Sequence, residues 1–297
     1  MKTTSGFHNG DRLFNWTNTF LFAIVAIIVL YPLYFIVIAS ISSPIRVNAG
    51  DVWLWPMDVS FDGYRKLLET TQIWIGYRNT ILYTVVGTAV STAVTILGAY
   101  ALSRKDLSGR NIIMFLIVLT MFFSGGLIPI YLQVKALGML NTMWAVILPT
   151  SVSAFQIIIT KTFYEYTIPK ELLEAAQMDG CNNTYFFFRM VVPLSQSIIA
   201  VIVLFNFVGH WNAYFNALMY LNNEVKYPLQ LVLRDILLQN QAADLSGGDV
   251  KDLVERQRFA EMIKYSTIIV ASLPLLVLYP FLQKYFVQGV MIGSIKG

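Results

Sequence analysis

Polar side chains that can form hydrogen bonds gather in one otherwise apolar stretch, FNFVGHWNAYFNALMY at residues 205–220. If this stretch is one helix, with about 100° per residue, its polar and small residues share one face. That face consists of Asn206, Gly209, His210, Asn212, Ala213, Asn216 and Ala217. Polar groups inside hydrocarbon need partners or water, so we expect this face to point toward a cavity or a partner subunit. The chemistry that it offers is hydrogen bonding.

The sequence lacks the combinations of residues that covalent catalysis or metal binding would need. Its 2 histidines, His8 and His210, lie far apart, and its 1 cysteine is Cys181. A multi-cysteine metal site and an intrachain disulfide are therefore excluded, and no nucleophile stands in a catalytic constellation. No Gly-Lys pair occurs, which excludes the glycine-rich loop that cradles nucleotide phosphates. We predict no catalytic residue, no metal ligand and no ATP hydrolysis by the chain itself.

A second candidate site is a polar insert, TIPKELLEAAQMDG, between apolar stretches. Pro169 suits the first turn of a helix, Glu171 complements the helix dipole there, and Gly180 suits the left-handed residue just past the end. The pattern predicts a short helix over about 169–179. Its apolar face consists of Leu172, Leu173 and Ala176, and the small Ala175 and Ala176 permit close approach by a partner.

A second helix is expected directly after this one. It begins at one of three good capping residues, Asn182, Asn183 or Thr184, and runs through YFFFRMVV to Pro193. Two helices joined by a glycine elbow at Gly180 would form an L-shaped unit that can act as a stiff lever.

The elements that must position these sites are membrane helices. The chain has 297 residues, 56% of them hydrophobic and 13% charged, with a mean hydropathy of +0.60, which is too apolar for a water-soluble globule. A bilayer core needs about 20 apolar residues per helix. We therefore predict an all-α, polytopic membrane protein with six transmembrane helices. Their approximate ranges are 14–40, 76–102, 111–132, 143–165, 193–221 and 262–286.

Positive residues indicate the orientation, because short cytoplasmic loops are enriched in Lys and Arg. The turn SRKDLSGR carries Arg104, Lys105 and Arg110, and the N-terminal segment adds Lys2 and Arg12. Both termini and the segment of about 166–193 are then expected in the cytoplasm. The formal net charge of +4 indicates this orientation and no nucleic-acid partner.

Three further patterns concern packing. Ser124, Gly125 and Gly126, followed by Pro129, predict a bend near the outer end of the third span. The small-residue spacing of Gly87 and Ser91, or of Ala89 and Ala93, allows the second span to pack closely on a neighbour. The amphipathic stretch LQLVLRDILL at 229–238 is expected either to dock an extracytoplasmic partner or to lie on the membrane.

The segment of about 166–193 contains a spaced motif. Glu174-Ala175-Ala176 is followed by three residues, Gly180, nine residues and then Met190-Val191-Val192-Pro193. This resembles the EAA loop of ATP-binding-cassette importer permeases, with Met190 and Val192 in place of the usual Ile and Leu. The loop couples the permease to its ATPase in that family, and the segment of about 166–193 is here called the coupling loop. NTILYTVVGTAVSTAVTILGAYALSR, IPIYLQVKALGMLNTMWAVILP, FNFVGHWNAYFNAL and KYFVQGVMIGSIKG also look like the carbohydrate-uptake permeases of the maltose-permease MalG type, closest to the LplC and YtcP branch.

The resemblance implies a fold and a set of partners. It implies the type I importer permease fold, with residues 1–297 as a single transmembrane domain, core spans over about 76–286 and an additional N-terminal span at about 14–40. The partners would be a second homologous permease, two ABC ATPase subunits that hold ATP and Mg, an extracytoplasmic solute-binding protein and a sugar. The chain itself would bind no cofactor and would lie in the bacterial cytoplasmic membrane. The implied ATPase-coupling residues are Glu174, Ala175, Ala176 and Gly180, with Leu172 and Leu173 beside them.

The polar face of the fifth span gives candidates for contact with a sugar. Amide and imidazole groups hydrogen-bond to sugar hydroxyls, and aromatic rings cover sugar C–H faces. The candidates are Asn206, His210, Trp211, Asn212, Tyr214 and Asn216. The alternative is that these residues hold helices together, and for His210 a structural hydrogen bond is the favoured interpretation.

Two other functions compete with an ATP-driven importer. An ion-coupled secondary transporter would need ionisable groups in its span centres, where only His210 is available. A membrane-embedded glycan-modifying enzyme would need a nucleophile or a metal cluster, and the sequence offers neither.

Overall fold

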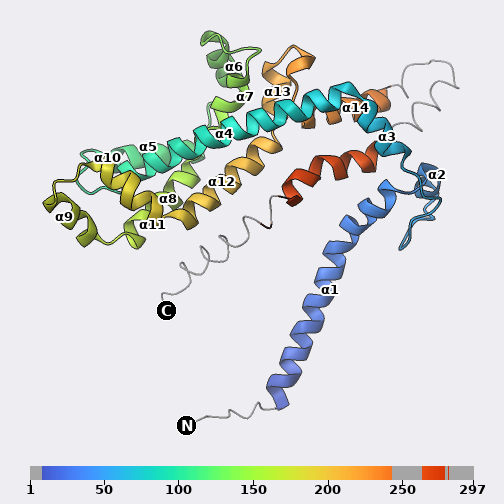
Figure 1. Cartoon of the computed structure of the whole chain (residues 1–297), viewed down its shortest axis with the longest axis horizontal. Helices are drawn as coiled ribbons and strands as arrows, with labels where there is room; N and C mark the ends of the chain where they lie inside the picture. Colours follow the sequence, from blue (N-terminus) through green and yellow to red (C-terminus); the bar gives the residue numbers. More distant parts are fainter. Residues whose placement is uncertain (1–8, 243–262, 278–279, 281–297) are drawn as a thin grey trace. The chain divides into compact units, whose positions relative to one another are not determined.

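The computed structural model describes residues 9–242, 263–277 and 280, and in this part of the chain every regular element is helical (Figure 1). The chain forms two compact units. The first comprises residues 1–69 and 236–271, and the second comprises residues 70–235 and 272–297. The carboxy-terminal motif KYFVQGVMIGSIKG and the end of the sixth predicted span lie outside the described residues.

The first unit contains a long apolar helix and a short folded segment. Its helices are α1 (Asn9–Ser40), α2 (Pro44–Asn48), α3 (Asp62–Glu69) and the first part of the helix Ile263–Val277. Residues 14–37 of α1 are largely exposed and apolar, as expected of a helix that faces lipid. Arg46 forms ion pairs with Asp51 (3.1 Å) and Asp58 (2.9 Å), which fold the segment after α1.

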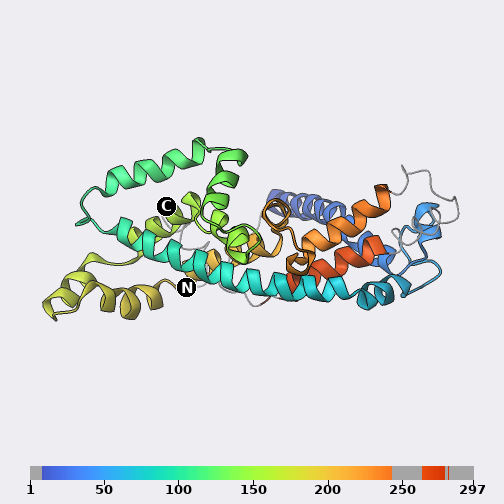
Figure 2. The ribbon, with the colours of Figure 1, turned by 90° about the horizontal axis from the view of Figure 1, so that it is seen from above.

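The second unit is built around α4, which runs from Thr71 to Ser103. The helices α8 (Ala154–Thr167) and α12 (Gln196–Trp211) pack along α4, as Figures 1 and 2 show. The buried side of α4 carries small and hydroxyl residues, whereas its exposed side carries large apolar ones. The buried hydroxyl residues are Thr80, Thr84, Thr88, Ser91, Thr92 and Thr95. This arrangement suits a helix surrounded by hydrocarbon, where polar groups turn inward.

Only two described helices are long and apolar enough to cross a membrane alone, Phe14–Ser40 and Thr71–Ser103. Three bent pairs could each form one further span, which gives up to five in the described residues. The pairs are Arg110–Phe122 with Leu127–Ala136 (118°), Met143–Thr150 with Ala154–Thr167 (54°), and Asn183–Leu194 with Gln196–Trp211 (83°). The predicted spans over 111–132, 143–165 and 193–221 are thus broken helices, and a bend was predicted only for the first of them.

Each break follows a local cause. Between α5 (Arg110–Phe122) and α6 (Leu127–Ala136), Gly126 has a φ of +83°, which confirms the predicted bend. Pro149 lies in the 3₁₀ turn η1 (Leu148–Thr150) that separates α7 (Met143–Ile147) from α8. Pro193 lies in α11 (Val192–Leu194), just before the break at Ser195. Proline lacks the N–H that would continue a helix ladder, so these sequences end one helix and start another.

The amphipathic stretch 229–238 packs on the chain itself. The sequence had predicted that it would dock an extracytoplasmic partner or lie on the membrane. It belongs to α14 (Leu229–Ala242), and its residues Leu229, Leu231 and Leu233 are buried. The N–H of Leu229 donates to Thr80 Oγ1 (2.7 Å) on α4. A Cβ added at Gly76 would lie 3.0 Å from Leu229 Cα, so glycine is what permits this approach.

Candidate functional site

The predicted coupling helix is α9, which runs from Lys170 to Met178. Its end is a Schellman cap: the N–H of Cys181 donates to the Ala176 carbonyl (2.9 Å) and the N–H of Gly180 to the Gln177 carbonyl (3.0 Å). Gly180 has a φ of +76°, as its position after the helix predicted. The elbow is therefore a fixed turn that is closed by two hydrogen bonds.

The second helix starts at Asn182, the first of the three predicted caps. Its side-chain Oδ1 accepts from the N–H of Tyr185 (2.7 Å). The chain continues through α10 (Asn183–Phe186), a π turn η2 (Phe187–Val191) and α11. The π turn brings Phe187 and Val191 into the interior, where they are 2% and 0% exposed.

The first face of α9, its core face, anchors the helix to the rest of the unit. Ala176 is buried in a cluster with Phe186, Phe187 and Val191, and Leu172 and Leu173 pack against the same cluster. Ala99 of α4 and Tyr164 of α8 complete the cluster. Three of the predicted coupling residues thus contact the permease itself, and they set the position of α9.

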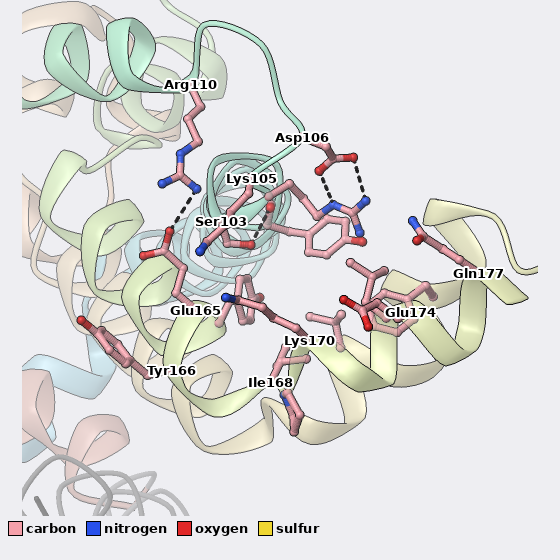
Figure 3. Close-up of a pocket in the computed structure, with 17 residues that line it drawn as sticks. Ser103, Lys105, Asp106, Arg110, Glu165, Tyr166, Ile168, Lys170, Glu174 and Gln177 are labelled. Carbon is pink, nitrogen blue, oxygen red and sulfur yellow. Dashed lines mark hydrogen bonds and ion pairs between the residues drawn. The ribbon is translucent and has the colours of Figure 1, made fainter.

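The second face, the cavity face, borders a cavity of about 640 Å³ (Figure 3). Lys170, Leu173, Glu174 and Gln177 supply the α9 side of this cavity. The remaining walls come from the end of α4, the turn between α4 and α5, the end of α8 and the residues after Gly180. Those walls consist of Tyr100, Ser103, Arg104, Lys105, Asp106, Arg110, Tyr164, Glu165, Tyr166, Ile168, Pro169, Phe186 and Val191.

The third face, the outer face, points away from the apolar cluster and from the cavity. It consists of Glu171, Ala175 and Met178, which are all exposed, and Met178 is 90% exposed. At about 100° per residue these three side chains lie on one stripe. An exposed methionine beside an alanine, flanked by a carboxylate, is a surface that a partner protein can cover.

Ion pairs connect charged side chains in the walls of the cavity. Glu165 of α8 pairs with Arg110 (3.3 Å) at the start of α5 and with Lys161 (2.8 Å). Arg104 binds Asp106 through two hydrogen bonds of 2.8 Å, which lowers the pKa of the Asp106 carboxyl and raises the pKa of the Arg104 guanidinium. The ammonium groups of Lys105 and Lys170 lie close together at the edge of the cavity (Figure 3), and the contact with Lys170 lowers the pKa of the Lys105 ammonium.

The predicted polar face of the fifth span is split between two helices, so the expectation of one continuous face is wrong. Helix α12 ends at Trp211, and α13 begins at Phe215. At the junction, the side-chain amide of Asn212 donates to the Val208 carbonyl (3.0 Å). Such local bonds from asparagine offer the backbone an alternative to further helix.

Before the junction, the polar residues of α12 bind α4. His210 Nε2 lies 3.0 Å from Ser91 Oγ, and Asn206 donates to Thr92 Oγ1 (3.2 Å). A Cβ at Gly87 would meet the His210 ring at 2.8 Å. The predicted close packing at Gly87 and Ser91 is therefore present, and it is built around the imidazole. The alternative pair, Ala89 and Ala93, is exposed.

The other substrate candidates lie in different surroundings. Trp211 is 2% exposed and stacks on Phe207, with 6.0 Å between ring centroids. Asn216 on α13 donates to the Val146 carbonyl (3.3 Å). Asn212 is exposed and Tyr214 is 43% exposed, so these two side chains are accessible at the junction.

Two sets of residues were missed by the sequence reasoning. One is the row of hydroxyls on α4, whose spacing of three and four residues marks the buried face of a membrane helix. The other is the pair of Tyr164 and Lys170, which line the cavity beside α9 and were not singled out. Among the described residues, no group of three or more His, Cys, Asp and Glu residues could hold a metal ion.

Comparisons with known proteins agree with this architecture. The family model for the binding-protein-dependent transport system inner membrane component matches residues 94–292. The polygalacturonan/rhamnogalacturonan transport system permease protein YtcP of Bacillus subtilis (strain 168) is 41% identical, over 97% of this chain and 99% of the relative. Protein LplC of the same organism is 38% identical over 98% of each chain.

A solved structure is similar over almost the whole chain. It is the crystal structure of a bacterial ABC transporter involved in the import of the acidic polysaccharide alginate. The TM-score is 0.84 with 34% sequence identity, and the match covers 95% of this chain and 100% of the other. These matches confirm the resemblance based on the EAA motif. The chain therefore belongs to the family of binding-protein-dependent transport system inner membrane components, and it is the permease component of an ATP-binding-cassette importer, with no catalytic site of its own.

Proposed function

We propose that this permease imports oligosaccharides derived from polysaccharides, driven through α9 by separate ATPase subunits. The relatives named above include a polygalacturonan/rhamnogalacturonan permease and a transporter involved in alginate import, which supports this substrate class. The observation that carries the coupling role is the geometry of α9. Its outer face is exposed, while its core face is fixed in an apolar cluster and its end is closed by the Gly180 cap.

The mechanism follows from this rigidity. When ATP and Mg draw two ATPase subunits together, a socket that holds Glu171, Ala175 and Met178 moves α9 with it. The displacement passes through the Gly180 turn and the Phe187 cluster to α12, and the sugar route then faces the other side of the membrane. Tighter binding of the ATPase dimer to one of the two states supplies the free energy. Glu174 is available to a basic residue of the ATPase, a contact of about 0 to 1 kcal/mol if it stays exposed.

The sugar route lies beside the junction of α12 and α13. Asn212 and Tyr214 are exposed there and are the first candidates for contact with the sugar. Asn206, His210, Trp211 and Asn216 are engaged with other parts of the chain, so they would shape the wall of the route. A second homologous permease supplies the opposite wall, and a solute-binding protein delivers the sugar from outside.

The proposed orientation places both termini and the coupling loop in the cytoplasm, with six spans in one domain. Cys181, the 1 cysteine, is partly exposed and tests this directly. An impermeant maleimide should label Cys181 in inside-out vesicles and not in intact cells, and bound ATPase subunits should reduce the labelling. Labelling from outside in intact cells contradicts the orientation.

Uptake by the complete complex tests the function. Proteoliposomes with both permeases, the ATPase subunits and the binding protein should accumulate a pectin or alginate oligosaccharide only with ATP. Gly180→Pro should insert normally but reduce uptake at least tenfold, because proline cannot adopt a φ of +76° and cannot donate to Gln177.

Gly50→Pro is the matched control. Gly50 also has a φ of +76° and its N–H also closes a turn, but it lies in the other unit. This variant should retain most of the uptake. Normal uptake in Gly180→Pro would contradict the proposal that the Gly180 turn transmits the movement. Uptake by the isolated chain without ATPase subunits would contradict the ATP-driven mechanism.

A further inference from the structure

Three consecutive large apolar side chains are exposed in the segment between α2 and α3. Trp53, Leu54 and Trp55 are 70%, 60% and 74% exposed. Residues 51–58, which contain them, are here called the tryptophan loop. A contiguous exposed apolar patch of this kind marks a surface that contacts another protein or a membrane. The surroundings of the loop decide between these two.

The base of the tryptophan loop is charged and fixed. Arg46 of α2 pairs with Asp51 (3.1 Å) at one end of the loop and with Asp58 (2.9 Å) at the other. The N–H of Ser43 donates to the Met57 carbonyl (3.1 Å), which holds the returning chain just past the end of α1. A charged base with an apolar tip is the distribution expected of a segment that enters the membrane interface from water.

The tip of the loop is held beside α1 by two tyrosines. Tyr31 Oη donates to the Trp53 carbonyl (3.2 Å), and Tyr34 Oη donates to the Leu54 carbonyl. The loop therefore turns back along α1, toward the middle of that helix. The indole N–H of Trp53 donates to the Gly50 carbonyl (2.7 Å), so this ring can enter apolar surroundings with its donor already satisfied.

The two tyrosines lie where the lipid-facing surface of α1 ends. Residues 14–34 are all exposed apart from Asn18, whereas residues 38–40 are buried within the unit. At about 1.5 Å per residue, a run of about 20 exposed residues is about 30 Å long, which is the thickness of a bilayer core. Tyrosine and tryptophan are enriched at the boundary of that core. The tip of the loop is thus tied to the level of the membrane interface.

We infer that the tryptophan loop is a membrane anchor, in which Trp53, Leu54 and Trp55 insert between the headgroups and the acyl chains of phospholipids beside α1. The anchor continues the lipid-facing surface of α1, and it fixes the depth of the first unit in the bilayer. In the proposed orientation these lipids belong to the outer leaflet. Only this choice of leaflet rests on the proposed function; the contact with lipid does not.

Fluorescence quenching in nanodiscs tests the inference. The complete transporter is assembled with Cys181→Ser in this chain and no cysteine in the other subunits, and a dye is attached at Leu54→Cys or at Asn48→Cys. Asn48 is the matched control, because it is exposed at the polar end of α2 in the same unit. Phosphatidylcholine with a nitroxide near the top of its acyl chain should quench the dye at residue 54 about threefold more than the dye at residue 48. Aqueous iodide should give the reverse order.

Tyr31→Phe with Tyr34→Phe removes the two hydroxyls that hold the loop, and it should lower nitroxide quenching at Leu54→Cys about twofold. Unchanged quenching in this variant would contradict the role of the tyrosines. Equal iodide quenching at residues 48 and 54 would overturn the lipid contact. Protection of residue 54 from both quenchers would assign the tip to another subunit and would also overturn it. These measurements need neither ATP nor sugar, so their outcome is independent of the proposed transport function.

Discussion

The interior of the α4–α12 interface is polar, whereas the interior of the coupling loop is apolar. Between α4 and α12 the buried side chains include Thr92, Asn206 and His210, and the exposed ones on α4 include Ile81 and Val85. In the coupling loop the buried side chains are aromatic or aliphatic, and the exposed ones include glutamate and asparagine. Both regions belong to the same compact unit.

In the proposed orientation the α4–α12 interface lies in hydrocarbon and the coupling loop lies in water, and the surrounding solvent then accounts for the difference. In hydrocarbon, an apolar side chain gains little by moving inward, and association relies on close packing and on hydrogen bonds between helices. In water, the same apolar side chain gains about 25 cal/mol for each Å² that it buries. A single unit can therefore have a polar interior in one region and an apolar interior in another. The two regions meet where the ring of Tyr100 on α4 contacts the ring of Phe187, with 4.9 Å between ring centroids.

The largest expected effect tests the apolar interior. Phe187→Ala should lower the free energy of unfolding by about 3 to 5 kcal/mol, because the ring is 2% exposed and its removal leaves a cavity. Phe188→Ala is the matched control: Phe188 is the next residue and is 58% exposed, so its loss should cost less than about 1 kcal/mol. Thermal unfolding of the purified complex measures both. Similar costs for the two variants would mean that the coupling loop has no interior of its own.

A smaller effect is expected for close packing in the polar interior. Gly87→Ala places a methyl group 2.8 Å from the His210 ring and should destabilise the protein by about 1 to 3 kcal/mol. Gly98→Ala on the same helix meets no atom within 4 Å and should be neutral or slightly stabilising. Unfolding in detergent compares the two variants. Equal stability would show that α4 and α12 do not depend on this contact.

The smallest effect concerns a single hydrogen bond between the same helices. A double-mutant cycle of Ser91→Ala and His210→Phe should give a coupling free energy of about 0.6 kcal/mol, which is typical of such bonds in membranes. The cycle of Ser91→Ala with Asn216→Leu serves as the reference, because Asn216 binds Val146 on a different helix. Its coupling should be near zero. Equal coupling in both cycles would assign the effect to general packing and not to the bond.

Local signals in the sequence predicted local structure correctly. The left-handed Gly180, the Asn182 cap and the bend at Gly126 each depend on the conformational preference of one residue and its neighbours. Gly180 and Asn182 fix the end of α9 and its elbow, which is why the coupling helix could be placed within a residue or two of its observed bounds.

Features that depend on contacts between distant residues were not predictable in the same way. The end of α12 at Trp211 was missed for another reason: Asn212 bonds locally to the Val208 carbonyl there, while the hydropathy pattern stays apolar and periodic on both sides. The stretch 229–238 is amphipathic, but only the fold reveals that α4 covers its apolar face through Gly76 and Thr80. Hydropathy describes how apolar a segment is, and it does not identify the surface that covers it.

The outer face of α9 can be changed independently of the two other faces of this helix. Glu171, Ala175 and Met178 touch neither the apolar cluster nor the cavity, so their side chains can change without rebuilding the lever beneath them. Under the proposed coupling role, exchanging these positions for those of another importer should let this permease work with that importer's ATPase subunits.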